Sequence, residues 1–80
     1  MKSIKIRYFA SLRESAGRES EDLEIECATY GELYTHLASK YRFILPVKMI
    51  QVAVNDAFTK LDALIEDGTT VVFIPPVAGG

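Results

Sequence analysis

The spacing of apolar residues changes along this chain, and that change limits the folds it can adopt. Near the start, Ile4, Ile6 and Tyr8 alternate with charged residues, as in a strand with one buried face. Residues 22–27 repeat the alternation, whereas residues 30–41 carry apolar side chains at helical intervals. Strand patterns return after the helix. Two strands, one main helix and further strands describe a compact α+β domain.

The start of the main helix has its own signal. Thr29 lies three residues before Glu32, which is the spacing of a capping box. We therefore expect a helix at 30–41, with Gly31 as a weak point near its beginning. We also expect one short helical turn at 10–15, in the loop between the first two strands.

The second half of the chain reads as three more strands. Within the loop before the last strand, we expect Leu64 and Ile65 to turn inward. The right-handed crossover rule lets the last strand lie parallel to the first, in the middle of a mixed sheet. The expected order is β-β-α-β-β-β. The expected elements are strands at 50–54, 58–60 and 70–74, a turn at 55–56 and a loop at 61–66, which has room for a helical turn.

Composition excludes several classes of function. With 80 residues, the chain is one domain, and 11 acidic against 9 basic residues give a net charge of −2. That balance gives no electrostatic footprint for nucleic acid or an anionic membrane. No apolar run approaches the ~18 residues of a membrane span, and the start lacks a signal-peptide core. The single cysteine, Cys27, predicts a reducing, cytoplasmic setting and a buried structural role.

Metal chemistry has no support in the pattern either. His36 lies off the apolar stripe of the helix and has no histidine or cysteine at ligand spacing. We therefore expect His36 at the surface and no metal site.

If Gly80 is the natural terminus, we expect the chemistry of this protein at the end of the chain. Pro75 and Pro76 have no N–H group, so the last strand stops there and the chain leaves the fold stiff and extended. Gly79 and Gly80 lack side chains, so they fit a channel too narrow for other residues. We expect a domain at 1–76 and a flexible Gly-Gly tail at 77–80. The alternative is a frayed terminus or a cloning remnant.

These motifs resemble a known family. The element order and the Gly-Gly ending resemble the ubiquitin-like β-grasp fold. The opening at 4–14, the Val-Ala-Val-Asn run at 52–55, Asp67-Gly68 and the Pro-Pro-Val-Ala-Gly-Gly ending are similar to the small subunit of molybdopterin synthase. The resemblance covers nearly the whole chain, and the ending is its most specific part.

The chain departs from the family pattern at a few positions. Thr69 and Thr70 replace an Asp-Glu pair, Ile74 replaces a phenylalanine, and Ala78 replaces serine or threonine. Isoleucine keeps the apolar surface and alanine stays small, so no group that the chemistry requires is lost.

The resemblance implies sulfur carriage at the terminal carboxyl group. A ubiquitin-activating-type enzyme would adenylate Gly80 with ATP, and a sulfur donor would displace AMP to leave a thiocarboxylate. The tail of Val77, Ala78 and Gly79 would present that sulfur to a cyclic pyranopterin monophosphate in the large subunit. The domain would need no cofactor of its own and would not be an enzyme alone.

Strand parity predicts the partner surface. Phe9 falls on the face opposite Ile4, Ile6 and Tyr8, and Ile74 points away from the core in the last strand. Phe58, just after the 55–56 turn, joins them if the strands are neighbours. The alternative is that one or two of them pack under the 10–15 loop. The resemblance implies that apolar residues at the positions of Phe9, Phe58 and Ile74 dock the large subunit, in a heterotetramer of two small and two large subunits.

Other functions share the same fold and tail. One alternative is a sulfur carrier for thiamine synthesis or tRNA thiolation, although the thiamine carrier is usually shorter and lacks the Pro-Pro pair. The other is a ubiquitin-like protein modifier or a plain binding module. A modifier would form isopeptide bonds to lysine, and a binding module would tolerate loss of Gly80.

Overall fold

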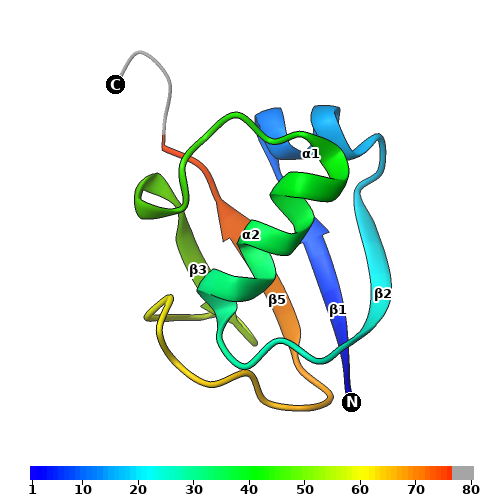
Figure 1. Cartoon of the computed structure of the whole chain (residues 1–80), viewed down its shortest axis with the longest axis vertical. Coiled ribbons are helices and arrows are strands. Elements are labelled where there is room, and N and C mark those ends of the chain that lie inside the picture. Colours follow the sequence, from blue (N-terminus) through cyan, green and yellow to red (C-terminus); the bar gives the residue numbers. More distant parts are fainter. Residues whose placement is uncertain (77–80) are drawn as a thin grey trace.

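The computed structural model describes residues 1–76, which form one five-stranded mixed sheet with a helix across one face (Figure 1). The strand order is β2-β1-β5-β3-β4. The predicted α+β class and element order are confirmed. In chain order the elements are β1 (Lys2–Tyr8), α1 (Ala10–Ala16), β2 (Ser20–Ile25), α2 (Tyr30–Tyr41), the 3₁₀ turn η1 (Val47–Met49), β3 (Gln51–Val54), β4 (Ala57–Thr59) and β5 (Thr70–Ile74).

The last strand occupies the centre of the sheet, as the crossover rule predicted. β5 runs parallel to β1, with Ile6 opposite Val71, and antiparallel to β3, with Val52 opposite Phe73. The edge strands β2 and β4 each pair antiparallel with the strand that precedes them in the sequence. Because β5 has a neighbour on both sides, its end at Ile74 is held firmly in place.

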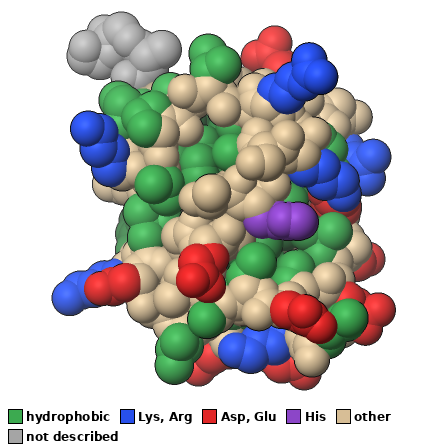
Figure 2. Space-filling model, viewed as in Figure 1, with side chains coloured by type: hydrophobic (Ala, Val, Ile, Leu, Met, Phe, Trp, Pro, Cys, Tyr) green, Lys and Arg blue, Asp and Glu red, His purple; other side chains and the backbone are tan. Residues whose placement is uncertain are grey.

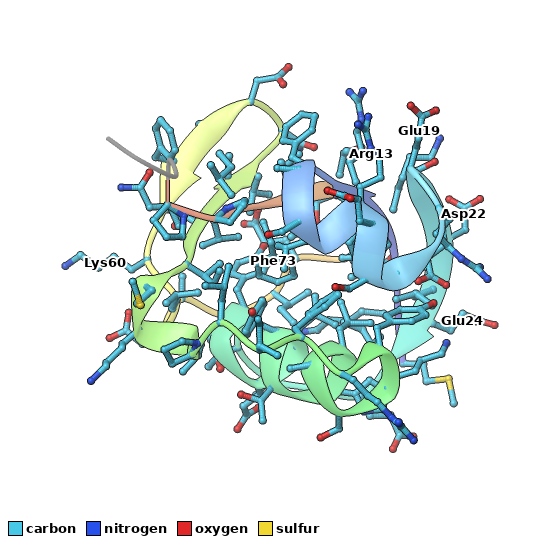
Figure 3. The ribbon with its side chains drawn as sticks, turned by 90° about the horizontal axis from the view of Figure 1, so that it is seen from above. Arg13, Glu19, Asp22, Glu24, Lys60 and Phe73 are labelled. Carbon is cyan, nitrogen blue, oxygen red and sulfur yellow. The ribbon has the colours of Figure 1, made fainter. Side chains whose placement is uncertain are left out.

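Alternation along the strands separates a buried face from an open one. Val71 and Phe73 of β5 are fully buried and pack in one cluster with Leu33 and Leu37 of α2. In Figure 3, Phe73 lies between the sheet and α2. In Figure 2, which views the molecule from the α2 side, charged side chains of both signs surround the helix. The core is thus the layer between the sheet and α2.

The start of α2 is fixed by hydrogen bonds that the sequence predicted. The Thr29 hydroxyl accepts from the backbone N–H of Glu32 at 3.2 Å, and the Glu32 carboxylate accepts from the backbone N–H of Thr29 at 3.3 Å. Gly31 has a packing role there. Its N–H donates to the Leu61 carbonyl at 2.7 Å, and a Cβ at Gly31 would lie only 3.3 Å from that oxygen. Glycine therefore lets the 61–66 loop approach the helix.

The 61–66 loop also contains the residue for which the prediction is wrong, Leu64. Leu64 is 70% exposed, whereas Ile65 is buried as predicted. Leu64 forms a β-bridge with Thr29, and the Ile65 N–H donates to the Ala28 carbonyl at 2.9 Å. In such extended pairing, neighbouring side chains point to opposite sides, so only one of the two can reach the core. The loop contains turns and no helix.

Some element boundaries also differ from the prediction. β2 ends at Ile25, so Cys27 lies beyond the strand and is half-buried against the core rather than fully enclosed. β4 covers Ala57–Thr59, one residue earlier than expected. The expected turn at 10–15 is a full seven-residue helix, α1. Across residues 1–76, no helix has the length and apolar character that a membrane crossing needs.

Candidate functional site

The predicted site begins where the central strand ends. Pro75 and Pro76 follow Ile74 and cannot donate to a neighbouring strand, so the ladder stops there. The end of β1 lies at the same end of the sheet because β1 and β5 are parallel, and the N-terminus lies at the opposite end (Figure 1). The tail residues Val77, Ala78, Gly79 and Gly80 are outside the described residues.

An apolar surface lies beside this exit, on the face of the sheet that α2 does not cover. Its side chains are 43% exposed at Phe9 and 71% exposed at Phe58, and half-buried at Ile74. The structure thus brings together the three residues predicted as a partner surface. We call this surface the outer strip; it consists of Phe9, Phe58, Val72 and Ile74, with the buried Ala53 between β4 and β5.

The strip is built by the register of four strands. Arg7 of β1 lies opposite Val72 of β5, Val72 lies opposite Ala53 of β3, and Ala53 lies opposite Phe58 of β4. Side chains directly opposite one another on one face lie close enough to touch. This row therefore runs unbroken across the sheet, and Arg7 is its one charged member.

Phe9 is placed by the junction between β1 and α1. Its backbone is still extended, with φ −124° and ψ 151°, and it serves as the N-cap of α1. Its carbonyl accepts the N–H of Leu12 at 3.0 Å. Phe9 follows Tyr8 and therefore points to the outer face, where the Arg7 guanidinium carbon lies 6.0 Å from the centre of its ring. Phe9 is 43% exposed and does not belong to the buried core cluster, which favours the outward position for this residue.

Phe58 is placed by the tight turn before β4. Asn55 and Asp56 both have positive φ, 50° and 71°, which is the geometry of a two-residue hairpin loop. The Asn55 side-chain oxygen accepts the N–H of Thr70 at 2.9 Å, which ties the turn to β5. The short strand β4 then carries Phe58 outward, into solvent.

The outer face changes character along the strands. Away from the tail, it holds an open depression of about 500 Å³ whose lining includes the charged residues Lys5, Asp22 and Glu24. There Lys5 lies between Asp22 on β2 and Thr70 on β5. Arg7 is the next outward residue of β1 after Lys5, so it lies between this depression and the outer strip. The lining residues are Ser3, Ile4, Lys5, Asp22, Leu23, Glu24, Gly68, Thr69 and Thr70.

The buried face contains a charged group that the sequence analysis missed. The Glu21 carboxylate accepts hydrogen bonds from Tyr8 at 2.6 Å and from Tyr41 at 2.5 Å, and Arg18 lies 3.4 Å away. Burial acts to raise the pKa of Glu21, but the two tyrosine donors and nearby Lys40 and Arg18 outweigh it and lower that pKa. Burial, and then Glu21, raise the pKa of Tyr8. No local signal predicts this group, because its members come from three elements.

These titratable groups are paired with one another within residues 1–76. The Glu21 group lies at the edge of the α2-covered layer, on the side opposite the outer strip, and every member is engaged in a hydrogen bond or ion pair. His36 is exposed, as predicted. Among residues 1–76, no cluster of three or more His, Cys, Asp or Glu side chains is arranged to hold a metal ion.

Sequence comparison places the chain among known proteins. Residues 6–80 match the ThiS family. The chain is similar to the molybdopterin synthase sulfur carrier subunit of Mycobacterium tuberculosis, with 35% identity covering 100% of both chains. It is also similar to the Escherichia coli protein of the same description, with 31% identity covering 96% of this chain and 99% of that one.

Solved structures share the fold. A putative molybdopterin converting factor subunit 1 from Pyrococcus furiosus superimposes with a TM-score of 0.77, at 25% identity over 96% of this chain and 100% of that one. A chain in the BexX/CysO complex of Amycolatopsis orientalis superimposes with a TM-score of 0.63, at 29% identity over 96% of this chain and 99% of that one. The fold is the ubiquitin-like β-grasp.

Proposed function

Because this chain belongs to the ThiS family, we propose that it is the sulfur carrier subunit of a molybdopterin synthase. The observation that carries this conclusion is the 35% identity to a curated subunit of that description over the full length of both chains. The same description applies to the Escherichia coli relative. The alternatives of a thiamine carrier, a tRNA-thiolation carrier or a protein modifier have no comparable support.

The proposed chemistry takes place at the Gly80 carboxyl group. A carboxylate oxygen attacks the α-phosphorus of ATP on a separate adenylating enzyme, and pyrophosphate leaves. Hydrosulfide supplied by a donor then attacks the carbonyl carbon of the acyl adenylate, the bond to AMP breaks, and a thiocarboxylate remains. That sulfur attacks a carbon of a cyclic pyranopterin monophosphate held by the large subunit and displaces an oxygen substituent. Water then cleaves the thioester, so the sulfur stays on the pterin and the Gly80 carboxylate is regenerated. Two charged carriers supply the two sulfurs of the dithiolene.

In this scheme the domain presents its tail and docks, and its partners supply the catalytic groups and bind ATP. Even fully extended, four residues span at most about 14 Å, so residues 77–80 limit how far the sulfur can lie from Pro76. The large subunit must therefore bind close to the end of β5. The outer strip lies beside that end and exposes Phe9 and Phe58, which suits it as the docking surface.

Intact-mass measurement tests the carrier proposal. The protein is expressed beside the adenylating enzyme and sulfur donor of its own organism. We expect a gain of about 16 Da, because one oxygen is replaced by sulfur. A chain without Gly80 should fold normally and gain nothing, since the change is confined to the terminus. Replacing Gly79 with isoleucine should also block modification, because a branched side chain closes a narrow channel. Full modification of the shortened chain would refute the proposal.

A second measurement identifies the product of the pathway. Purified thiocarboxylated protein is mixed with the large subunit and the pyranopterin precursor, and molybdopterin formation is followed. We expect one carrier consumed per sulfur transferred and a complex of two small and two large subunits in solution. Transfer of the sulfur to a thiazole or a tRNA base, with none to the pyranopterin, would instead support the alternative carriers. We also propose that this reaction takes place in the cytoplasm.

A further inference from the structure

Arg7 occupies an unusual place for a charged residue. Its cross-strand neighbours on the outer face are Ser20 on one side and Val72 on the other. Its guanidinium carbon lies 6.0 Å from the centre of the Phe9 ring, within the range of a cation–π contact. An exposed arginine thus lies at the end of an otherwise apolar row, next to one of its aromatic residues.

The domain gives Arg7 no counter-charge of its own. Across residues 1–76, the two ion pairs join Arg13 to Glu19 at 3.7 Å and Arg18 to Glu21 at 3.4 Å. Glu19 and Glu21 are therefore already engaged by other arginines. The next cation on this face, Lys5, lies directly opposite Asp22, whereas Arg7 lies opposite Ser20.

A partner that covers the outer strip also covers Arg7. While the face is open, water solvates the guanidinium and its exposure costs nothing. Once it is covered, an unpaired charge between apolar surfaces loses that solvation, which is strongly unfavourable unless the partner supplies an opposite charge. The planar donors of a guanidinium match the geometry of a carboxylate, so a carboxylate is the counter-charge that suits Arg7 best.

We propose that the partner surface covering the outer strip presents a carboxylate to Arg7, so that an ion pair at the edge of an apolar contact selects the partner. The inference rests on the proposed function, in which that partner is the large subunit. A second copy of this chain is a poorer fit. Two outer strips meeting about a two-fold axis would bring two copies of Arg7 and Lys5 into one contact, where like charges repel.

Binding of purified large subunit to Arg7 variants tests the proposal. Arg7→Glu should weaken the affinity about 30-fold or more, because it sets two carboxylates against each other. Arg7→Met should also weaken it, since the partner's carboxylate is left unpaired, whereas Arg7→Lys should restore part of the loss. Lys48→Glu is the matched control. Lys48 is exposed in η1, outside the outer strip, and its variant carries the same change in net charge as Arg7→Glu.

Salt dependence separates an ion pair from a simple packing effect. The affinity of the unaltered protein should fall as salt rises, and Arg7→Met should show a smaller fall. A charge-reversing lysine at the partner's carboxylate should restore binding to Arg7→Glu. Equal or tighter binding by Arg7→Met, with an unchanged salt slope, would overturn the inference.

A parallel variant distinguishes failure of this inference from failure of the interface itself. Phe58→Ala removes an exposed aromatic residue of the outer strip without changing charge. If Phe58→Ala weakens binding and the Arg7 variants do not, the interface stands and the ion pair is refuted. If neither changes binding, the outer strip is not the docking surface and both fail. Sedimentation of the free protein tests whether a second copy of this chain covers the outer strip instead. A dimer that forms in the unaltered protein but not in Phe58→Ala would assign the strip to a second copy and overturn the proposal.

Discussion

The two faces of the sheet are built from the same strands, yet one face is buried and the other is exposed. On β1, Ile4, Ile6 and Tyr8 are buried beneath α2, whereas the alternate residues Lys5 and Arg7 are exposed on the other side. On β5, Phe73 is fully buried and Ile74 is only half-buried. The buried face is covered by α2 of the same chain. The outer face instead leaves aromatic and charged side chains exposed to solvent.

Polar groups show the same contrast. On the buried face, tyrosine hydroxyls reach partners at the margins of the core. Tyr34 donates to the Leu45 carbonyl at 2.8 Å, and the Tyr30 oxygen accepts the N–H of Glu66 at 3.3 Å. Within residues 1–76, no buried side-chain nitrogen or oxygen is left without a hydrogen bond. Substitutions on this face should therefore change stability, whereas substitutions on the outer strip should change binding.

The largest expected effect is on the buried face. Leu37 is fully buried, so Leu37→Ala should lower the free energy of unfolding by about 2–5 kcal/mol through a cavity. The matched control is Leu64→Ala, the same substitution at a side chain that is 70% exposed, which should change it by less than about 0.5 kcal/mol. Urea denaturation of both variants measures the difference. Equal losses would mean that burial does not separate the two sites.

The outer strip should show the reverse behaviour. Phe58→Ala should weaken binding to the large subunit by about 2 kcal/mol or more, at least ~30-fold, because an interface aromatic residue loses its packing. The thermal midpoint should barely move, since Phe58 is 71% exposed in the free domain. Calorimetric titration and a thermal melt test the two halves of this prediction. A variant that melts early yet binds normally would reverse the roles of the two faces.

The sequence predicts those structural features that depend on a local residue pattern. The faces of β1 and β5 follow from alternation within each strand, and the capping box marks α2. The position of Leu64 could not be predicted, because it depends on a bridge to Thr29, 35 positions earlier in the chain. The place of Arg7 beside the outer strip needs the register of β1 against β5, which no local pattern supplies.

A smaller effect should come from the charged group on the buried face. Because the pKa of Glu21 is lower in the folded protein than its ordinary value, the carboxylate stabilises the fold above that ordinary value. This stabilisation should be lost as pH falls through the lowered pKa. Glu21→Gln should cost about 1–3 kcal/mol at pH 7, since the hydrogen bonds from Tyr8 and Tyr41 lose their charged acceptor.

Urea denaturation from pH 7 down to pH 3 tests the sign of that effect. The unaltered protein should lose stability toward the acid end, and Glu21→Gln should lose less over the same interval. Glu24→Gln, on the same strand but exposed and pointing to the outer face, is the control and should behave like the unaltered protein. If the two glutamine variants have the same pH profile, the tyrosine pair does not hold Glu21 in its charged form.

The smallest effect is expected at Cys27, where a thiol is the one other group that could carry sulfur. Cys27 is only half-buried against the core, so Cys27→Ser should cost no more than about 1 kcal/mol, less than full burial would imply. Sulfur transfer to the pyranopterin should continue unchanged, because the proposed sulfur-bearing atom is the Gly80 carboxyl carbon. A stable Cys27→Ser protein that gains no mass beside the adenylating enzyme would place the sulfur on the thiol, and the tail would then serve only for docking.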